Sequence, residues 1–138
     1  MTGWTGDIEA ITVGNSTFRT VLFTGSNLQL TVMSLEPGEE IGLEMHDHRD
    51  QFIRVEDGNA TVTLGPSQDK IDETHQLADD WAVIVPGGTW HNVINTGDTP
   101  LRLYSLYAPP EHADGVIHHT KAEADAAEHG SRGRRTQR

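Results

Sequence analysis

Residues 42–58, GLEMHDHRDQFIRVEDG, place His46 and His48 two positions apart in a segment that reads as β-structure. On a strand, residues two apart project from the same face, so both imidazoles should share one face. The next two residues are polar and can form a turn, which would let Gln51 open the following strand toward the same interior. Nitrogen donors on one face are what a divalent transition metal prefers. Taken alone, an HxH pair is weak evidence for a metal site and is more often a pair of surface or structural histidines.

A second stretch, residues 80–95 (DWAVIVPGGTWHNVIN), contains another histidine. This residue, His91, follows Gln51 by 40 positions. His91 begins a strand directly after a Pro-Gly-Gly turn, so its ring can converge on the first pair from a separate strand. Glu44 precedes His46 by two residues and should share its face. A carboxylate there is a candidate catalytic base or a further metal ligand, and otherwise a charge at the mouth of the fold.

Outward from these stretches, apolar residues alternate with polar ones, which predicts an all-β fold of many short antiparallel strands. Strands are predicted over residues 8–13, 18–23, 28–32, 41–48, 51–57, 60–64, 70–77, 81–85, 90–95 and 101–107. Residues 121–129 alone have helical composition. Residues 1–107 should form a β-barrel and residues 108–138 an appendage, with about the last ten residues disordered. In the final strand either Leu103, Ser105 and Tyr107 or Arg102, Tyr104 and Leu106 face inward, and apolar alternation favours the first set.

The two stretches together resemble the two signatures of the cupin superfamily. Residues 42–58 carry the glycine, HxH and terminal glycine of the first signature, and Pro86, Gly88, His91 and Asn95 match the second. The resemblance implies a small jelly-roll barrel with one metal held by His46, His48, Gln51 and His91. Two residues depart from the pattern: Gln51 stands where many members have Glu, and Asp80 where the second signature usually begins with Gly. A glutamine oxygen can ligate a metal, but weakly and without charge.

Composition excludes several classes of protein. The 138 residues contain no cysteine, which rules out disulfide scaffolds, thiolate metal sites and cysteine nucleophiles. The net charge of −11 would repel a phosphate backbone, so no nucleic-acid partner is expected. The start lacks the features of a signal peptide and no apolar run is long enough to span a bilayer, so we expect a soluble, cytoplasmic protein without a membrane partner.

The leading functional hypothesis is a metal-dependent cupin enzyme that acts on a small organic molecule by dioxygenase, isomerase or lyase chemistry. The metal would be Fe, Mn, Ni or Zn, and the ligand a small anionic or chelating molecule. Two alternatives stay open: a non-catalytic ligand-binding or sensing cupin, and a phosphosugar isomerase-like cupin. The resemblance also implies a homodimer, to which the segment around residues 18–23 could contribute an edge strand. The histidine at 75 and the four in the appendage are interpreted as solvated residues.

Overall fold

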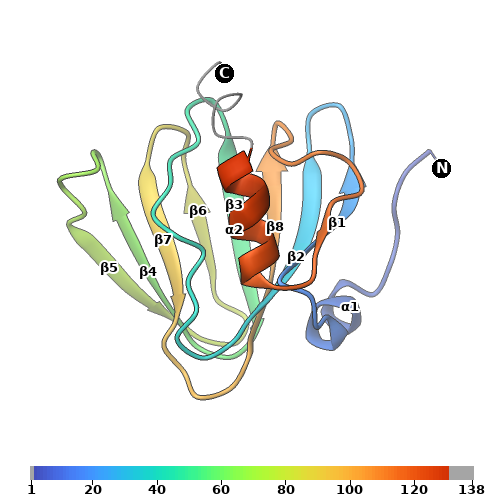
Figure 1. Ribbon diagram of the computed structural model, residues 1–138, viewed down its shortest axis with the longest axis horizontal. Coiled ribbons are helices and arrows are strands. Elements are labelled where there is room, and N and C mark those ends of the chain that lie inside the picture. Colours follow the sequence, from blue (N-terminus) through green and yellow to red (C-terminus); the bar gives the residue numbers. More distant parts are fainter. Residues whose placement is uncertain (1, 131–138) are drawn as a thin grey trace.

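The computed structural model describes residues 2–130, which form a sandwich of two antiparallel β-sheets (Figure 1). The larger sheet has the strand order β6-β3-β8-β2-β1-β9 and the smaller one β5-β4-β7. The strands are β1 (Arg19–Thr24), β2 (Gln29–Leu35), β3 (Asp50–Asp57), β4 (Ala60–Gly65), β5 (Glu73–Leu77), β6 (Ala82–Val85), β7 (Trp90–Asn95), β8 (Leu101–Ala108) and β9 (Ile117–His118). The predicted antiparallel β-fold is confirmed, although the two sheets are not joined into a closed barrel.

The core lies between the inner faces of the two sheets. β8 alternates strictly between buried and partly exposed residues, and its inward set is Leu103, Ser105 and Tyr107, as predicted. All seven residues of β2 are buried because its outer face is covered too. The apolar part of the core comes mainly from β2, β3, β8 and the smaller sheet, and includes Met33, Leu35, Ile53, Val55, Val62, Val93, Leu101 and Leu103.

Residues 8–13, predicted as a strand, instead belong to helix α1 (Ile8–Gly14), which packs on β2, β3 and β8. The side chain of Asp7 accepts a hydrogen bond from the Ala10 amide at 3.1 Å and caps the first turn. Such a cap typically stabilises a helix by about 1 kcal/mol. The strand prediction was wrong because a short apolar run fits both periods, and the cap and the packing surface decided between them.

The predicted strand over 41–48 is also wrong, and this difference shapes the site. Residues 40 and 44 make only isolated bridges to β7, and residues 47–48 form a turn. Gly42 has a φ of +110°, a conformation that side-chain-bearing residues rarely adopt, so the segment cannot run as a regular strand. The alternation that would place His46 and His48 on one face therefore does not hold.

The chain beyond β8 packs onto the sandwich. β9 pairs with β1, and helix α2 (Lys121–Gly130) lies in front of the space between the sheets, with Ala124 buried in the same core cluster as Phe18 (Figure 1). The predicted helix is confirmed. Most of the segment predicted to be disordered, residues 131–138, lies outside the described residues. No described helix is long and apolar enough to cross a membrane.

The arrangement of the larger sheet bears on the predicted dimer edge. β1 lies between β2 and β9, so the segment around residues 18–23 is not an outer strand of its sheet. The outer strands are β6 and β9. The homodimer itself stays a prediction.

Candidate metal centre

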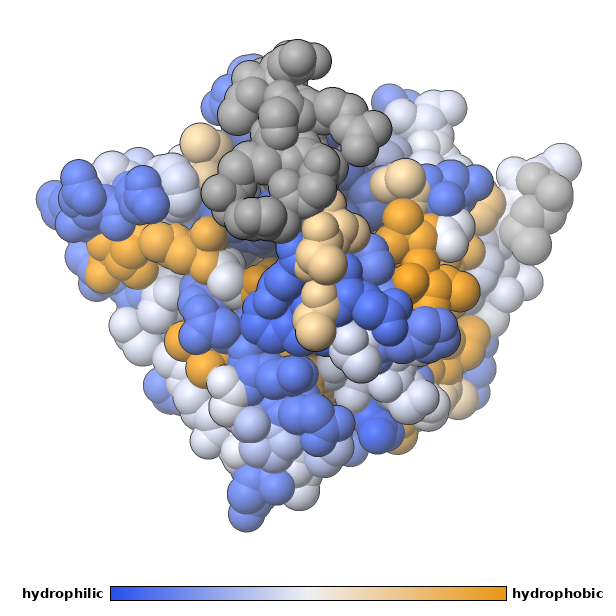
Figure 2. All heavy atoms as spheres, viewed as in Figure 1, coloured by the Kyte–Doolittle hydropathy of each residue, from blue (hydrophilic) through white to orange (hydrophobic). Residues whose placement is uncertain are grey.

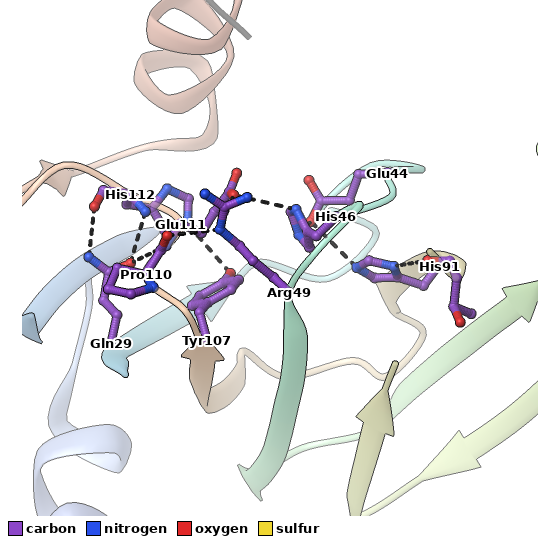
Figure 3. Close-up of polar contacts among 10 residues, drawn as sticks. Gln29, Glu44, His46, Arg49, His91, Tyr107, Pro110, Glu111 and His112 are labelled. Atoms are coloured by element: carbon purple, nitrogen blue, oxygen red, sulfur yellow. Dashed lines mark hydrogen bonds and ion pairs between the residues drawn. The ribbon is translucent and has the colours of Figure 1, made fainter. Parts of the chain in front are cut away.

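Three side chains that are far apart in the sequence meet at the mouth of the sandwich: Glu44, His46 and His91 (Figure 3). One donor atom from each lies within 4.8 Å of the others. Glu44 Oε1 is 3.3 Å from His46 Nε2 and 3.7 Å from His91 Nε2. Donors bound at about 2.1 Å from one ion lie roughly 3–3.5 Å apart, so these distances are close to those of a ligand set.

The backbone holds this cluster together. The Glu44 amide donates to the His91 carbonyl and the His91 amide donates to the Glu44 carbonyl, both at 2.9 Å. The Gly42 amide donates to Asn92 Oδ1 at 2.8 Å and ties the same segment to β7. Two histidines and a carboxylate are thus fixed by a loop that is bound to the strand carrying one of them.

Both imidazoles are oriented with Nε2 toward the cluster. His91 Nδ1 lies 2.9 Å from the Thr89 carbonyl, which can only accept, so Nδ1 carries the proton and Nε2 keeps its lone pair. His46 Nδ1 faces Glu111 Oε1 at 3.6 Å. Both Nε2 atoms are buried and, within residues 2–130, have no hydrogen-bond partner of acceptable geometry. Buried, unpaired lone pairs beside a carboxylate suit a metal ion.

The Glu44 carboxylate is charged in this setting. Burial alone would raise its pKa, but the close approach of the His46 and His91 rings outweighs burial and holds the pKa of Glu44 well below its usual range. A carboxylate that stays ionised is the form that can bind a cation.

Comparison with known proteins places these observations in a family. The family model for the Cupin domain matches residues 31–107, more than half of the chain. The chain belongs to the cupin family. The match begins on β2 and ends on β8, so it includes all three residues of the cluster.

Three relatives illustrate how far the similarity of this cupin extends. Uncharacterized protein YrkC of Bacillus subtilis is 55% identical over 122 residues, which are 88% of this chain and 66% of YrkC. The crystal structure of BH2720 from Bacillus halodurans superposes with a TM-score of 0.88 at 51% identity and covers 89% of this chain and 93% of that one. Mannose-1-phosphate guanylyltransferase RfbM of Salmonella typhimurium is 30% identical over 62% of this chain, but this is only 17% of RfbM.

The structure brings His46, His91 and Glu44 together and does not bring His48 to them. The side chain of His48 is 88% exposed and contacts Asp47, because the turn at 47–48 directs it outward. Gln51 is 2% exposed on the inner face of β3, where its Nε2 donates to Ser105 Oγ at 3.4 Å and its Oε1 has no partner. The sequence proposed Glu44 as a base or a further ligand, and its position at the centre of the cluster favours the ligand.

A second set of residues lies at the site and was not predicted from the sequence. The segment after β8 crosses the mouth, where Glu111 faces His46 and Arg49 Nε donates to the Pro110 carbonyl at 2.8 Å (Figure 3). Gln29, fully buried on β2, binds this segment: its Oε1 accepts from the Glu111 and His112 amides at 3.0 and 2.8 Å, and its Nε2 donates to the His112 carbonyl at 2.7 Å. The interpretation of His112 as a solvated tail residue was wrong.

His112 and Tyr107 form the wall of the site opposite His91. Their rings pack edge to face with centroids 5.2 Å apart, and His112 Nε2 is 3.4 Å from the Tyr107 hydroxyl. Burial raises the pKa of Tyr107 far above its usual value and lowers the pKa of His112 to about 3. At neutral pH the phenol therefore keeps its proton and the imidazole stays neutral, so both act through hydrogen bonds rather than charge.

Proposed function

We propose that this cupin holds one divalent transition metal on Glu44, His46 and His91 and uses it to bind and activate a small organic molecule. The observation that carries the proposal is the pair of buried, unpaired Nε2 atoms within 3.7 Å of the Glu44 carboxylate. Leaving two such atoms unpaired costs about 1–3 kcal/mol each, a cost that a bound cation would remove. Gln51 Oε1, also buried and unpaired, is the candidate for a fourth donor.

Two neutral imidazoles and one carboxylate are a donor set typical of non-haem Fe(II) sites that leave coordination positions open. A metal there would supply Lewis-acid polarisation of a bound carbonyl or water. The chain's own residues would orient the ligands. The Thr89 carbonyl fixes the tautomer of His91, and Glu111 faces the outer nitrogen of His46.

A second candidate is a cupin that binds a small ligand without turning it over. It is favoured by the state of Tyr107 and His112, because neither group exchanges a proton near neutral pH and neither is suited to acid–base catalysis. The two functions separate on turnover. The assay is run both with and without dioxygen. A metal-loaded enzyme should consume a small enolisable acid under at least one of these conditions, whereas a binding protein should return it unchanged.

The metal assignment is tested by elemental analysis of protein purified without a chelating tag. We expect about one metal ion per chain in the wild type and its loss in His91→Ala and His46→Ala. His75→Ala is the matched control, since that side chain is half exposed on β5 and pairs with Glu73. Occupancy should also fall as the pH drops below about 6.5, because a histidine must be neutral to ligate. Equal loss from His75→Ala, or no metal in reconstituted wild type, would refute the assignment.

A further inference from the structure

A cavity of about 280 Å³ lies between α2 and the segment that carries Glu44, and Glu44 is part of its lining. Its lining includes Phe18, which precedes β1, and Arg19, the first residue of β1. Gly42 and Glu44 on the loop and Lys121 on α2 also line it. Figure 2 shows hydrophilic side chains on both sides of α2 across this face.

Arg19 is the unusual residue in this lining. It lies on the inner face of β1, opposite Met33 of β2, and is only 9% exposed. Its Nε has no hydrogen-bond partner, and among the described residues no carboxylate forms an ion pair with its guanidinium. A buried charge without a partner is costly, so its retention points to a partner that comes from outside the chain.

The other charged residues that line the cavity are Glu44, Lys121, Asp125 and Glu128. Lys121 Nζ pairs with Asp125 at 3.1 Å, and Glu44 is engaged with the two histidines. Arg19 is also held in place, since its guanidinium carbon lies 5.4 Å from the centroid of the Phe18 ring, within the range of a cation–π contact. The guanidinium is therefore a positioned cation in the wall of a cavity that also reaches Glu44.

We propose that the ligand of this cupin is a small carboxylic acid whose carboxylate pairs with Arg19 while its other end reaches the Glu44–His46–His91 centre. The inference rests on the proposed metal function for that second contact. A planar guanidinium matches a carboxylate with two parallel hydrogen bonds, which a lysine cannot do. A divalent metal on one carboxylate leaves a net charge of +1, so the occupied centre and Arg19 would both attract an anion.

The experiment measures, on the same preparations, metal content and the affinity for malonate by calorimetry. The variants are Arg19→Met, which keeps the length of the side chain without its charge, and Arg19→Lys, which keeps the charge without the planar fork. Arg19→Met should retain its metal but bind malonate roughly 10- to 100-fold more weakly, the loss expected for a hydrogen-bonded charge pair. Arg19→Lys should lie in between. Lys70→Met is the control, and its affinity should change little because Lys70 is exposed on the turn between β4 and β5, outside the cavity lining.

The outcomes separate this inference from the metal assignment. Wild type that holds no metal would refute the proposed function alone. Comparing the malonate affinity of metal-free wild type with that of the metal-free Arg19 variants would then still test the role of Arg19. Metal-loaded Arg19→Met with wild-type affinity for malonate would overturn the role of Arg19. Arg19-dependent binding of inorganic phosphate or a hexose 6-phosphate, with none of malonate, would overturn the carboxylic acid in favour of a phosphate ester. An equal loss in Lys70→Met would reduce the effect to net charge and also overturn the proposal.

Discussion

The two ends of the sandwich interior use the same three strands in opposite ways. Along β3, β8 and β2 the inward residues align in rows across the sheet. The row nearest the mouth is Gln51, Tyr107 and Gln29, followed by Ile53, Ser105 and Thr31, then Val55, Leu103 and Met33, and finally Leu101 and Leu35. We call the first row together with Ser105 and Thr31 the polar end, and the last two rows the apolar end. Every residue of both ends is almost fully buried.

This contrast separates stability from binding within one core. The apolar end brings side chains out of water without leaving polar atoms unpaired, so it stabilises the fold. At the polar end and the adjoining cluster, Gln51 Oε1 and the Nε2 atoms of His46 and His91 are buried without a hydrogen-bond partner. Such atoms destabilise a fold unless a ligand meets them. The position of a residue along the strand, rather than its burial, thus decides what it contributes.

The largest expected effect comes from removing a side chain of the apolar end. Leu103→Ala should lower the free energy of unfolding by about 2–5 kcal/mol because it leaves a cavity in a fully buried row. Ser105→Ala, two residues further along the same face of β8, should cost less than about 1 kcal/mol, since Ser105 Oγ makes only a 3.4 Å contact with Gln51. Urea denaturation of both variants tests the contrast, and similar losses in the two would refute it.

The next effect is a pH dependence that belongs to the mouth. Burial lowers the pKa of His112 to about 3. As the pH falls, the unfolded chain therefore binds a proton near pH 6.5, whereas the folded chain binds it only near pH 3. The contribution of His112 to the free energy of unfolding is therefore fully present above about pH 6.5 and is lost as the pH drops toward 3. The loss between pH 7 and pH 5 is roughly 2 kcal/mol. His112→Phe keeps a ring against Tyr107 but cannot titrate, and it should lose this part of the pH dependence.

Urea denaturation at pH 7 and pH 5, with a chelator present to remove metal effects, measures this difference. Between pH 7 and pH 5 the wild type should lose roughly 2 kcal/mol more stability than His112→Phe. If both proteins lost stability equally over this range, His112 would not be buried in solution as it is here.

A smaller effect is expected from replacing a polar residue of the first row by an apolar one. Gln51→Leu removes a buried, unpaired oxygen and should stabilise the metal-free protein by about 1 kcal/mol. The same variant should bind metal more weakly if Gln51 Oε1 is the fourth donor, whereas Gln51→Glu should bind it more tightly through a charged oxygen. Urea denaturation with chelator and a metal titration check the two parts. Destabilisation of metal-free Gln51→Leu would show that the polar end contributes to stability after all.

The strands of this fold could be predicted from the sequence, but the loops at its mouth could not. Alternation in residues 101–107 identified the inward set on β8 because a strand with one face on the core has a period of two. The turn at Asp47 and His48 follows from backbone bonds between Glu44 and His91, two residues 47 positions apart. Neither residue reveals that contact locally, so His48 was grouped with His46.

The residues that close the mouth were hidden for the same reason. Gln29 holds the segment at Glu111 and His112 across more than 80 residues of sequence, and the segment itself is polar. An amide on a fully covered strand needs several partners, but nothing in the local pattern says which part of the chain supplies them. Long-range hydrogen bonds of this kind are a property of the folded chain.

The smallest expected effect distinguishes the cupin motif from the arrangement in the fold. His48→Ala should change metal affinity by less than about twofold and stability by less than about 0.5 kcal/mol, because the side chain is exposed and contacts only Asp47. Glu44→Gln is the matched partner: it keeps the shape of a cluster residue and removes its charge, so affinity should fall by more than about tenfold.

Competition with a coloured chelator measures both affinities on one scale. If His48→Ala lost its metal and Glu44→Gln kept it, the ligands would be those implied by the motif. The 47–48 turn would then have to reorganise on metal binding, breaking the contact of His48 with Asp47 and turning an exposed ring inward past His46. If instead the loss follows Glu44, the carboxylate takes the place that the motif gives to its second histidine. The backbone bonds between Glu44 and His91 then explain why, since they fix the carboxylate beside one imidazole before any metal arrives.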